Sequence, residues 1–465
     1  MASPPGSSHF HERKTMSAST WRRPSVVIRA VAVTSVLAMA LAACGGGRSD
    51  TPSGSGSSNS GAIDTAACTT DPAKATVTGD TITLGTSLPL SGIYSAFKGI
   101  LDGETAYIDY LNKDLGGVEV NGKKYQIKLE VKDDAYAAEK TVANVQSLID
   151  SNVFGLFNVV GTKNNLAIRD QVNEDCVPNL LAATGSPAWG NSKYPWLLGT
   201  FLVPYPDEMK ALVDYLKVEE PKATIAVLRA NDDFGGAYSD TLDSLVKGTD
   251  LKVVKVVGYD PETPDTKSQI TTLAATNADV LVIGGTLLAC PDALKNVAAS
   301  GWRPTTYMSG TCTSKTLMAI AGDAGNDVLT VLPLMDPSNP AFASSPAVTL
   351  YKEKLAKFAP TADPGNGIVA YGWTAGAMLQ KILEDSPKLT RLSVMETARS
   401  FTASGIGLMP KGAKFVTNIK NDWFLGEQFE IVQYSTTKGY FSPVGGAIDF
   451  NGKTASFTPK ALING

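Results

Sequence analysis

The sequence predicts an α/β protein made of two lobes, each a parallel sheet with helices on both faces. Segments with the pattern of strands and segments with the pattern of helices alternate from Thr81 onward, and a strand–helix–strand order is typical of parallel sheets. The alternation passes through two successive cycles, and 465 residues are more than one hydrophobic core usually holds. These observations favour two doubly wound lobes.

The first cycle begins with an apolar strand and continues through a helix whose apolar residues recur at helical spacing, Ile100, Leu101, Ala106, Tyr107, Tyr110 and Leu111. The remaining segments follow the same logic. Strands are expected at 81–88, 125–134, 153–160 and 177–183, and helices at 98–114, 137–152 and 165–175.

The second cycle repeats this order, and a third, mainly helical section follows it. Its strands are expected at 223–230, 251–260 and 279–285, and its helices at 208–217, directly after 231–238, at 268–278 and at 291–301. The third section has expected helices at 347–359, 368–385 and 390–401 and a final strand at 427–435.

The N-terminus has the parts of an export signal. Arg22, Arg23 and Arg29 precede an apolar run at 30–42, which is shorter than the roughly 20 residues that span a bilayer. The sequence Leu-Ala-Ala-Cys that ends at Cys44 resembles the lipobox of bacterial lipoproteins, in which the cut precedes a cysteine that carries the lipid. The alternative is an ordinary secretory signal with an incidental cysteine.

We therefore expect a signal peptide at 1–43 and a lipid on Cys44. Translation starts at Met1 or at Met16, and the sequence leaves this open. The stretch after Cys44 is rich in Gly and Ser and cannot bury enough apolar surface to order itself, so 44–79 is expected to be a flexible tether.

The composition argues against several classes of protein. The only two histidines, His9 and His11, lie within the expected signal peptide, so histidine-based catalysis and histidine metal ligation are disfavoured. The whole chain has a net charge of −4, and removal of the basic signal makes it more negative. An acidic protein lacks the positive surface that nucleic acid requires. We expect no enzyme activity, cofactor, metal or nucleic-acid partner.

Four cysteines remain after Cys44, an even number that suggests disulfides in an exported protein. Three pairings are possible. We favour Cys68–Cys176 and Cys290–Cys312, because Cys290 and Cys312 each follow an expected strand by a few residues in neighbouring units.

Other motifs give weak signals. No glycine-rich dinucleotide fingerprint follows a strand, and the sequence at 450–454 imitates a P-loop but has Ala447 where the first glycine is required. The acid pairs 133–134 and 232–233 resemble the carboxylates of a glycosidase, but adjacent acids at strand ends are more often turn and capping residues.

The ordered series of segments between about 80 and 440 resembles the branched-chain amino acid (Leu/Ile/Val-binding-like) family of ABC-transporter substrate-binding proteins. The segments that carry the resemblance are 82–99, 131–149, 159–189, 226–242 and 278–302. The resemblance implies a type I periplasmic-binding fold, with two lobes joined by three hinge crossings and the ligand between them. It implies lobe 1 at 80–203 and 333–423, and lobe 2 at 204–332 and 424–465.

The resemblance also implies where the ligand binds, since open parallel sheets bind ligands beyond the carboxyl ends of their strands. In lobe 1 the loop at 161–165 opens a helix, and its free N–H groups suit a carboxylate. Lobe 1 is expected to hold the polar part of the ligand, and lobe 2 to complete the pocket on closing. The candidate residues are Ser91, Tyr94, Thr162, Asn164, Asn165, Ala183 and Thr184 in lobe 1, and Asp233, Phe234 and Thr286 in lobe 2.

One departure from the family bears on the ligand. Amino-acid binders place an acid after the strand that corresponds to 305–310, whereas this chain has Gly310, Thr311, Cys312 and Thr313 there. A buried ammonium without a partner is costly. Either the ligand is a carboxylate or amide without an α-amino group, or Asp233 or another acid takes the place of the missing one.

The sequence therefore favours a monomeric, lipid-anchored protein on the outer face of the cell membrane or in the periplasm. It would capture a small polar solute, such as an amino acid, an amide or a small carboxylate, and pass it to an ABC permease. The alternative is a sensory ligand-binding subunit that signals to a membrane partner. A hydrolase or glycosidase is a third hypothesis, disfavoured by the missing histidines and motifs.

Overall fold

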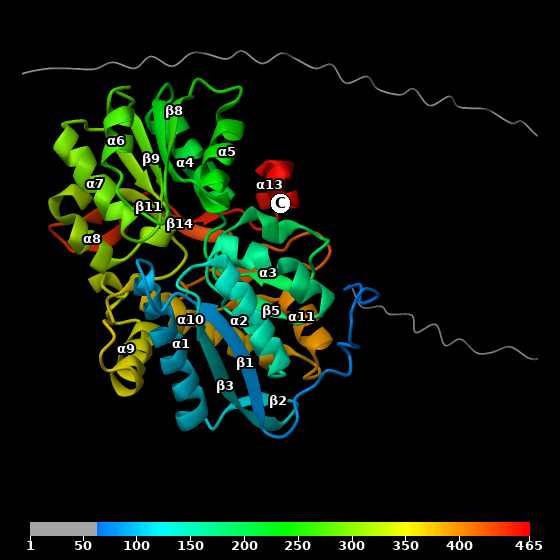
Figure 1. The fold of residues 1–465 in the computed structure, drawn as a ribbon. Coiled ribbons are helices and arrows are strands. Elements are labelled where there is room, and N and C mark those ends of the chain that lie inside the picture. Colours follow the sequence, from blue (N-terminus) through cyan, green and yellow to red (C-terminus); the bar gives the residue numbers. More distant parts are fainter. Residues whose placement is uncertain (1–62) are drawn as a thin grey trace, which may run out of the picture. The chain divides into compact units, whose positions relative to one another are not determined.

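A computed structural model describes residues 63–465 and shows two large sheets flanked by helices (Figure 1). The first sheet has the strand order β2-β3-β1-β4-β5-β6. All neighbouring pairs in it are parallel except β2 and β3, which form an antiparallel hairpin at the edge. Its strands are β1 (Thr81–Leu88), β2 (Val118–Val120), β3 (Lys123–Asp133), β4 (Gly155–Phe157), β5 (Asn179–Ala182) and β6 (Leu197–Gly199).

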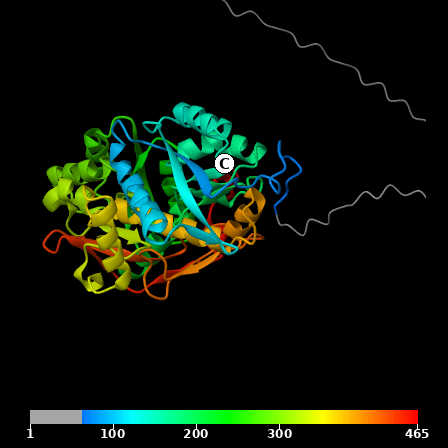
Figure 2. The same cartoon turned by 90° about the horizontal axis from the view of Figure 1, so that it is seen from below.

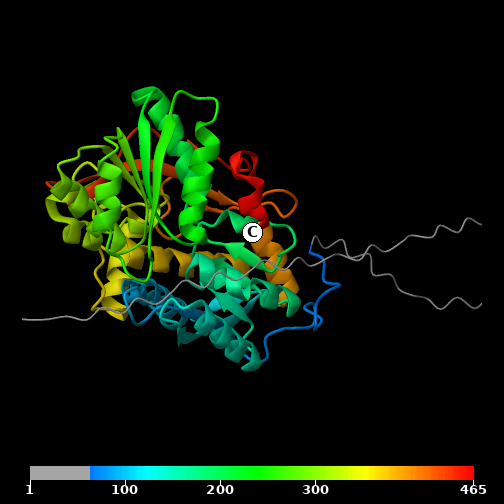
Figure 3. The same ribbon diagram turned by 45° about the horizontal axis from the view of Figure 1, so that its top comes forward.

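The second sheet has the order β15-β14-β11-β10-β9-β7-β8 and is parallel from β8 to β11. The strands β7 to β9 lie together in Figure 3, in green. These strands are β7 (Thr224–Ala230), β8 (Lys252–Tyr259), β9 (Val280–Gly284), β10 (Thr305–Met308) and β11 (Leu329–Leu332).

The far edge of the second sheet is antiparallel, a strand direction that the sequence analysis does not predict for its final strand. The final strand β14 (Gln428–Ser435) runs antiparallel to β11 and forms a hairpin with β15 (Tyr440–Pro443). The turn between β14 and β15 is short, and a short turn can connect only antiparallel neighbours, whereas a parallel pair needs a long crossover. The short strand β16 (Ile448–Asp449) also pairs with β14, and a separate two-stranded sheet holds β12 (Thr402–Ser404) and β13 (Lys414–Val416).

Helices cover both faces of each sheet. Figure 2 shows α1 on one side of β1 and β3 and the helices α2 and α3 on the other. The long helices are α1 (Lys98–Asp109), α2 (Ala138–Asp150), α3 (Thr162–Glu174), α4 (Tyr205–Glu219), α5 (Asp233–Val246), α7 (Ala289–Ser300), α9 (Pro346–Phe358) and α10 (Gly367–Asp385). The shorter ones are α6 (Lys267–Ala274), α8 (Lys315–Ala321), α11 (Arg391–Arg399), α12 (Thr454–Phe457) and α13 (Lys460–Asn464), and one-turn helices include η3 (Pro187–Gly190) and η4 (Gly310–Cys312).

The chain passes between the two sheets three times, which is the arrangement expected for a type I periplasmic-binding fold. The first passage follows β6 and leads into α4, and the second follows β11 and leads into α9. The third leads from the β12–β13 hairpin to β14. Helix α10 returns to the first sheet and packs on α1 so closely that both helices need glycine there. A Cβ on Gly103 would lie 2.1 Å from the Val369 carbonyl oxygen, and one on Gly372 would lie 2.0 Å from that of Ile100.

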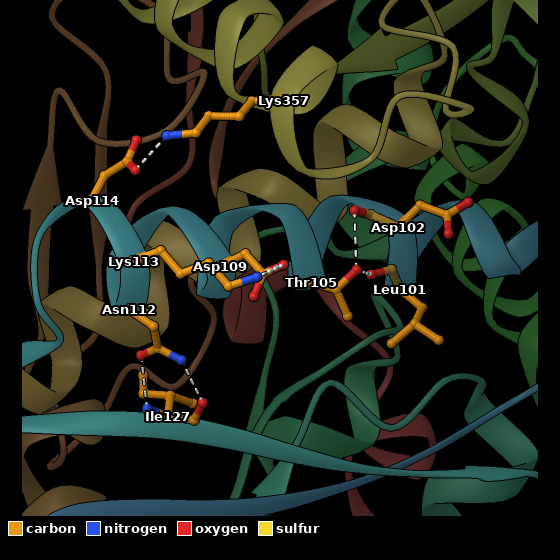
Figure 4. Close-up of polar contacts among 9 residues, drawn as sticks. All are labelled: Leu101, Asp102, Thr105, Asp109, Asn112, Lys113, Asp114, Ile127 and Lys357. Atoms are coloured by element: carbon orange, nitrogen blue, oxygen red, sulfur yellow. Dashed lines mark hydrogen bonds and ion pairs between the residues drawn. The ribbon is translucent and has the colours of Figure 1, made fainter.

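The C-terminal end of α1 is anchored to its neighbours by side chains (Figure 4). The helix continues as a π-helical turn, η2 (Tyr110–Asp114), in which Asn112 exchanges two hydrogen bonds with the main chain of Ile127 in β3, at 2.8 and 2.9 Å. Asp114 forms an ion pair with Lys357 of α9, with 2.6 Å between the charged atoms. These contacts hold α1 between the first sheet and the third section of the chain.

The sequence analysis counts residues 63–79 within the tether 44–79. In the structure this segment is bonded to residues at the end of α3 and to the loop before α11. Cys68 forms a disulfide with Cys176, the Thr69 amide donates to the Glu174 carbonyl at 3.0 Å, and the Thr76 hydroxyl donates to the Leu389 carbonyl at 2.6 Å. Because a disulfide and main-chain bonds hold it, this part of the segment is not a free linker. The expected signal peptide and Cys44 lie outside the described residues.

The second disulfide joins Cys290 at the start of α7 to Cys312 in η4. Both disulfides are the pairs that the sequence analysis favours. No helix within 63–465 is long and apolar enough to span a membrane.

Candidate functional site

The loops that follow the strands of the two sheets meet around a cavity with two adjoining compartments. The first, which we call the cleft compartment, encloses about 620 Å³ of space, part of it open to solvent. Loops after β4, β7 and β9 contribute Thr162, Phe234 and Thr286 to its wall. The site therefore lies beyond the carboxyl ends of the strands, where open parallel sheets bind ligands.

The wall on the side of the first sheet is built around the start of α3. The helix begins at Thr162 after Gly161, and no side chain of the described residues caps it. Its first amide N–H groups therefore remain available to a polar or anionic group of a ligand. Gly161 has a φ of 102°, and a Cβ there would lie 2.6 Å from the ring of Tyr136, so this position requires glycine.

Three buried hydroxyls form a chain behind this wall. The Thr162 and Thr184 hydroxyl oxygens are 2.6 Å apart, and the Thr184 and Tyr205 hydroxyl oxygens are 3.1 Å apart. Thr162 and Tyr205 line the cavity, and Thr184 connects them from behind. The chain links the loop after β4 to α4, which begins the second lobe's section of the sequence.

Tyr136 extends the same wall in an uncommon backbone conformation. Its φ is 66° and that of Ala135 is 48°, values in the left-handed region that few residues other than glycine adopt. The two carboxylates before it support the turn: Asp133 accepts from the Ala135 amide at 2.9 Å, and Asp134 accepts from the Tyr136 amide at 2.8 Å. The adjacent acids at 133–134 are thus turn residues that orient an aromatic ring toward the cavity.

The wall on the side of the second sheet is made by Phe234, Thr286 and the loop at 310–313. Phe234 is buried in α5, and its ring meets that of Tyr205 edge-on with 5.0 Å between centroids. The preceding Asp232 caps α5 by accepting from the Gly235 amide at 3.0 Å. Asp233 is exposed and does not line the cavity. In the acid pair 232–233, therefore, one residue caps a helix and the other is exposed, so the two are not an inward-facing pair of carboxylates of the kind a glycosidase uses.

Helix α10 closes the cavity from the third section of the chain. Tyr371 lines both compartments, donates its hydroxyl hydrogen to Thr200 Oγ1 at 2.8 Å, and accepts from the Asn158 side-chain amide at 3.1 Å. The ring is thereby held against the end of the first sheet.

The second compartment, which we call the hinge compartment, adjoins the first and encloses about 660 Å³, part of it also open to solvent. It lies between the first passage of the chain at 202–208, the second passage at 331–337 and α10. The two compartments share the wall residues Leu202, Tyr205, Gly310, Thr311, Thr313, Gly367 and Tyr371.

Among the described residues, Glu208 and Asp336 are the two acids that line the hinge compartment, and Glu208 is the one beside the loop at 310–313. Glu208 has three hydrogen-bond donors. Its carboxylate accepts from the Tyr238 hydroxyl at 2.9 Å, the Tyr307 hydroxyl at 2.8 Å and the Gly310 amide at 3.0 Å. Burial raises the pKa of Glu208 to about 7, and these three donors oppose that rise. An acid thus stands beside the loop in which the sequence analysis finds none, but it comes from α4.

The candidate residues from the sequence fall into three groups. Thr162, Ala183, Phe234 and Thr286 line the cleft compartment. Thr184, Asn164 and Asn165 are buried directly behind it: the Asn164 amide donates to the Val160 carbonyl at 2.9 Å, and Asn165 donates to the carbonyls of Val159 and Gly161. Ser91, Tyr94 and Asp233 are not among the lining residues.

Ser91 and Tyr94 hold the loop after β1 instead. Ser91 donates to the Asp133 carboxylate at 2.6 Å, and the Tyr94 hydroxyl donates at 2.6 Å to the carbonyl of Pro261, which follows β8 in the second sheet. Tyr94 also stacks on Tyr136 with 4.2 Å between ring centroids. Tyr94 thereby connects the two sides of the cavity without lining it.

Sequence reasoning missed several wall residues. Tyr136, Tyr205, Glu208 and Tyr371 line the cavity, but they lie in a turn, at a helix start and within a long apolar helix. The adjacent acids before Tyr136 are the one local signal of an unusual turn. Nothing in the sequence around Tyr371 separates it from the other apolar residues of α10.

A comparison with known protein families identifies the fold and the type of protein. The family model described as periplasmic binding protein matches residues 81–436. The chain belongs to the periplasmic binding protein family. This periplasmic binding protein is accordingly an extracytoplasmic solute-binding protein and not an enzyme, as the sequence analysis expects.

Solved structures of similar fold cover about four fifths of this periplasmic binding protein. A branched-chain amino acid ABC transporter protein from Thermus thermophilus with bound valine is 18% identical, with a TM-score of 0.70, and the match covers 80% of this chain and 97% of that one. A fatty acid ABC transporter substrate-binding protein from Thermomonospora curvata is 20% identical, with a TM-score of 0.70 and coverage of 82% and 96%. A leucine-binding protein from Thermotoga maritima is 16% identical, with a TM-score of 0.64 and coverage of 79% and 99%.

Proposed function

We propose that this protein is a lipid-anchored solute receptor that binds a small carboxylate or amide in the cleft compartment and delivers it to an ABC permease. The observation that carries the proposal is the cavity at the uncapped start of α3, with Thr162 on one side and Phe234 and Thr286 on the other. Backbone N–H groups at a helix start bind a carboxylate or an amide carbonyl, and the aromatic wall covers the apolar part of the solute.

The mechanism follows from the arrangement of the wall. Thr162 belongs to a loop of the first sheet and Phe234 to a loop of the second. A solute can contact both residues at the same time only when the two lobes are closed. It therefore binds the closed state better than an open one and shifts the population toward closure. The permease would recognise the closed form as loaded.

The first experiment identifies the solute. The protein is purified, unfolded and refolded to remove bound metabolites, and titrated by calorimetry with carboxylates, their primary amides and the apolar L-amino acids. Thr162→Val, which removes one hydroxyl at constant shape, is expected to weaken the best-binding compound by about 1–3 kcal/mol. Thr271→Val is the matched control, because Thr271 is an exposed threonine of α6. It should not change the affinity. Equal affinity in both variants would contradict this location of the site.

The second experiment separates transport from signalling. Deletion of the gene should abolish uptake of the identified solute if the protein feeds a permease, and should leave uptake intact if the protein is a sensory subunit. Cys44→Ala should release the protein from membranes or leave it unprocessed. Unchanged processing and membrane partitioning would contradict the lipid anchor.

A further inference from the structure

The hinge compartment is bounded mainly by apolar side chains. Its wall includes Val331, Leu332, Leu334 and Met335 from the second passage of the chain, Ala370 from α10 and Phe441 from β15. Four of these side chains, Val331, Met335, Ala370 and Phe441, belong to the buried core, so the compartment is continuous with the hydrophobic interior at the hinge.

The two acids on this wall already have hydrogen-bond partners. Glu208 accepts three hydrogen bonds from protein donors. Asp336 accepts from the Ser338 amide at 2.8 Å, the Ser338 hydroxyl at 2.6 Å and the Phe441 amide at 3.1 Å. Since the protein itself satisfies these carboxylates, and Lys315 is the one cation of the described residues that lines this compartment, most of its wall provides apolar contact.

The compartment is also the continuation of the proposed binding site. Tyr205, Thr311 and Tyr371 belong to both walls, so a molecule held at Thr162 can extend past them toward Leu334 and Ala370. Protein interiors are packed as closely as organic crystals, so an open space lined mainly by apolar side chains beside a polar binding site favours a ligand with an apolar extension.

We infer that the solute carries its carboxylate or amide at one end and an unbranched apolar chain at the other, and that the hinge compartment receives the chain. The inference rests on the proposed function and specifies its substrate class. The loop at 310–313 has Thr311 where the family's amino-acid binders place an acid, and the acid beside that loop, Glu208, already accepts three hydrogen bonds from the protein. The chain would pass Glu208, whose hydrogen-bonded carboxyl forms part of the wall.

The test uses a graded series of probes on the refolded protein: butanoate, hexanoate, octanoate and decanoate, all below their micelle concentrations, with the matching primary amides. Each methylene that enters the hinge compartment should tighten binding about three- to fourfold, as expected for a buried CH₂ group. The amides distinguish a preference for a charged head from a preference for a neutral one, and both heads fit the inference.

Two variants probe the compartment itself. Ala370→Leu narrows it, and should weaken decanoate at least tenfold while butanoate changes less than twofold. Leu334→Ala truncates one apolar wall residue, which is half-buried, and should weaken decanoate several-fold. This second variant keeps the test decisive if Ala370→Leu does not fold. Val218→Ala, on a residue that is 76% exposed on α4, is the control for mutation and handling.

The outcomes separate the inference from the proposed function. Affinity that stays constant beyond butanoate, or Ala370→Leu weakening butanoate and decanoate equally, would overturn the role of the hinge compartment. If Thr162→Val still weakened butanoate in that case, the cleft site would stand alone. If no carboxylate, amide or amino acid bound at all, the proposed function and this inference would both fail.

Discussion

At the residue scale, the cavity depends on buried polar side chains that bond to the main chain around it. Asn165 is the clearest case: its amide donates to the carbonyls of Val159 at 2.8 Å and Gly161 at 2.9 Å, and its oxygen accepts from Asn179 at 2.9 Å. These bonds fix the loop between β4 and α3, from which the wall at Thr162 projects. The residue supports the site from behind.

Asn165→Ala should therefore destabilise the fold as well as weaken ligand binding. The change leaves the buried Asn179 side-chain amide without its acceptor, while the Val159 and Gly161 carbonyls keep their main-chain donors, and we expect the free energy of unfolding to fall by about 1–3 kcal/mol. Chemical denaturation measures it. Gln146→Ala, in an exposed side chain of α2, should change stability by less than about 0.5 kcal/mol. Equal stabilities of the two variants would show that the Asn165 bonds contribute nothing.

Glu208 makes the stability of the protein depend on pH. Its folded pKa is raised from 4.5 to about 7 by burial, so the folded state holds a proton that the unfolded state has lost between these values. Its stabilising contribution is complete below about pH 4.5 and is lost as the pH rises through about 7. Burial also raises the pKa values of Asp207 and Glu427, which act in the same direction.

Glu208→Gln should consequently reduce the fall in stability between pH 4.5 and 7, because the amide has no proton to lose. Urea unfolding at several pH values within this window measures the slope. Glu353→Gln, on an exposed face of α9, serves as the control. A slope identical to that of the unmodified protein would mean that Glu208 does not titrate in this range.

At the element scale, one close contact fixes the approach of α3 to the turn after β3. Gly161 precedes α3 with a φ of 102° and leaves room for the ring of Tyr136, which itself has a φ of 66°. Both features belong to the wall of the cleft compartment. The geometry of this wall therefore depends on a residue without a side chain.

Gly161→Ala should weaken ligand binding by displacing Tyr136. A Cβ at this position would lie 2.6 Å from the ring, so the ring must move from its place in the wall of the cleft compartment. Gly248→Ala is the matched control, because Gly248 also has a positive φ, 78°, but no atom lies within 4 Å of its Cβ position. Both variants share the backbone cost of about 1 kcal/mol. A difference in ligand affinity between them isolates the contact with Tyr136, and no difference would argue against it.

The two disulfides should contribute unequally to stability. In the chain-entropy model the contribution grows with the length of the closed loop, and the sequence separations are 108 residues for Cys68–Cys176 and 22 for Cys290–Cys312. Replacing the first pair by alanines should therefore cost about 1.4 kcal/mol more than replacing the second. Denaturation of the two double variants measures the difference. A larger loss from the second pair would indicate that its local role beside the loop at 310–313 dominates.

At the scale of the whole molecule, contacts across the cavity hold its two sides together. The Tyr94 hydroxyl donates to the Pro261 carbonyl at 2.6 Å, and the Ser314 hydroxyl donates to the Asn366 side-chain oxygen at 3.0 Å. These bonds join the section around the first sheet to the section around the second without involving a ligand. They stabilise the closed arrangement in which the cavity is complete.

Tyr94→Phe removes one of these bonds and should shift the population toward an open form. We expect the affinity for the best-binding probe to fall two- to tenfold, in line with about 0.5–1.5 kcal/mol for one hydrogen bond. Calorimetry measures the affinity, and small-angle scattering should show a larger radius of gyration for the variant without ligand. Tyr440→Phe, on β15, is the control. Unchanged affinity and an unchanged radius would argue against a closing role for Tyr94.

Much of the fold could be predicted because its signals are local. The strand at 81–88 coincides with β1, and the helices and strands of both cycles lie at the expected segments, since apolar periodicity of 2.0 or 3.6 is read over a few neighbouring residues. The antiparallel edge at β14 and β15 was not predicted. Strand direction depends on which neighbour a strand finds, and β14 lies more than 90 residues after its partner β11.

The candidate site could be predicted only in part. Thr162, Ala183, Phe234 and Thr286 directly follow strands or begin helices at strand ends, and all four line the cleft compartment. Tyr205, Glu208 and Tyr371 occupy no such position, and they reach the cavity because α4 and α10 pack around it. Ser91 and Asp233 also follow strands, but neither lines the cavity. Ser91 is hydrogen-bonded to Asp133, and Asp233 is exposed at the start of α5.

The sequence by itself determined the α/β class, the two cycles, the absence of histidine after the expected signal and the family resemblance, because composition and short-range periodicity are properties of the chain. Only the tertiary structure decided which side chains face the cavity and that a second, apolar compartment adjoins it. The walls of that compartment come from 202–208, 331–337, 365–371 and Phe441, which are distant in sequence. They meet because hydrophobic burial packs α4, α10 and the second sheet together, and burial of this kind depends on three-dimensional neighbours.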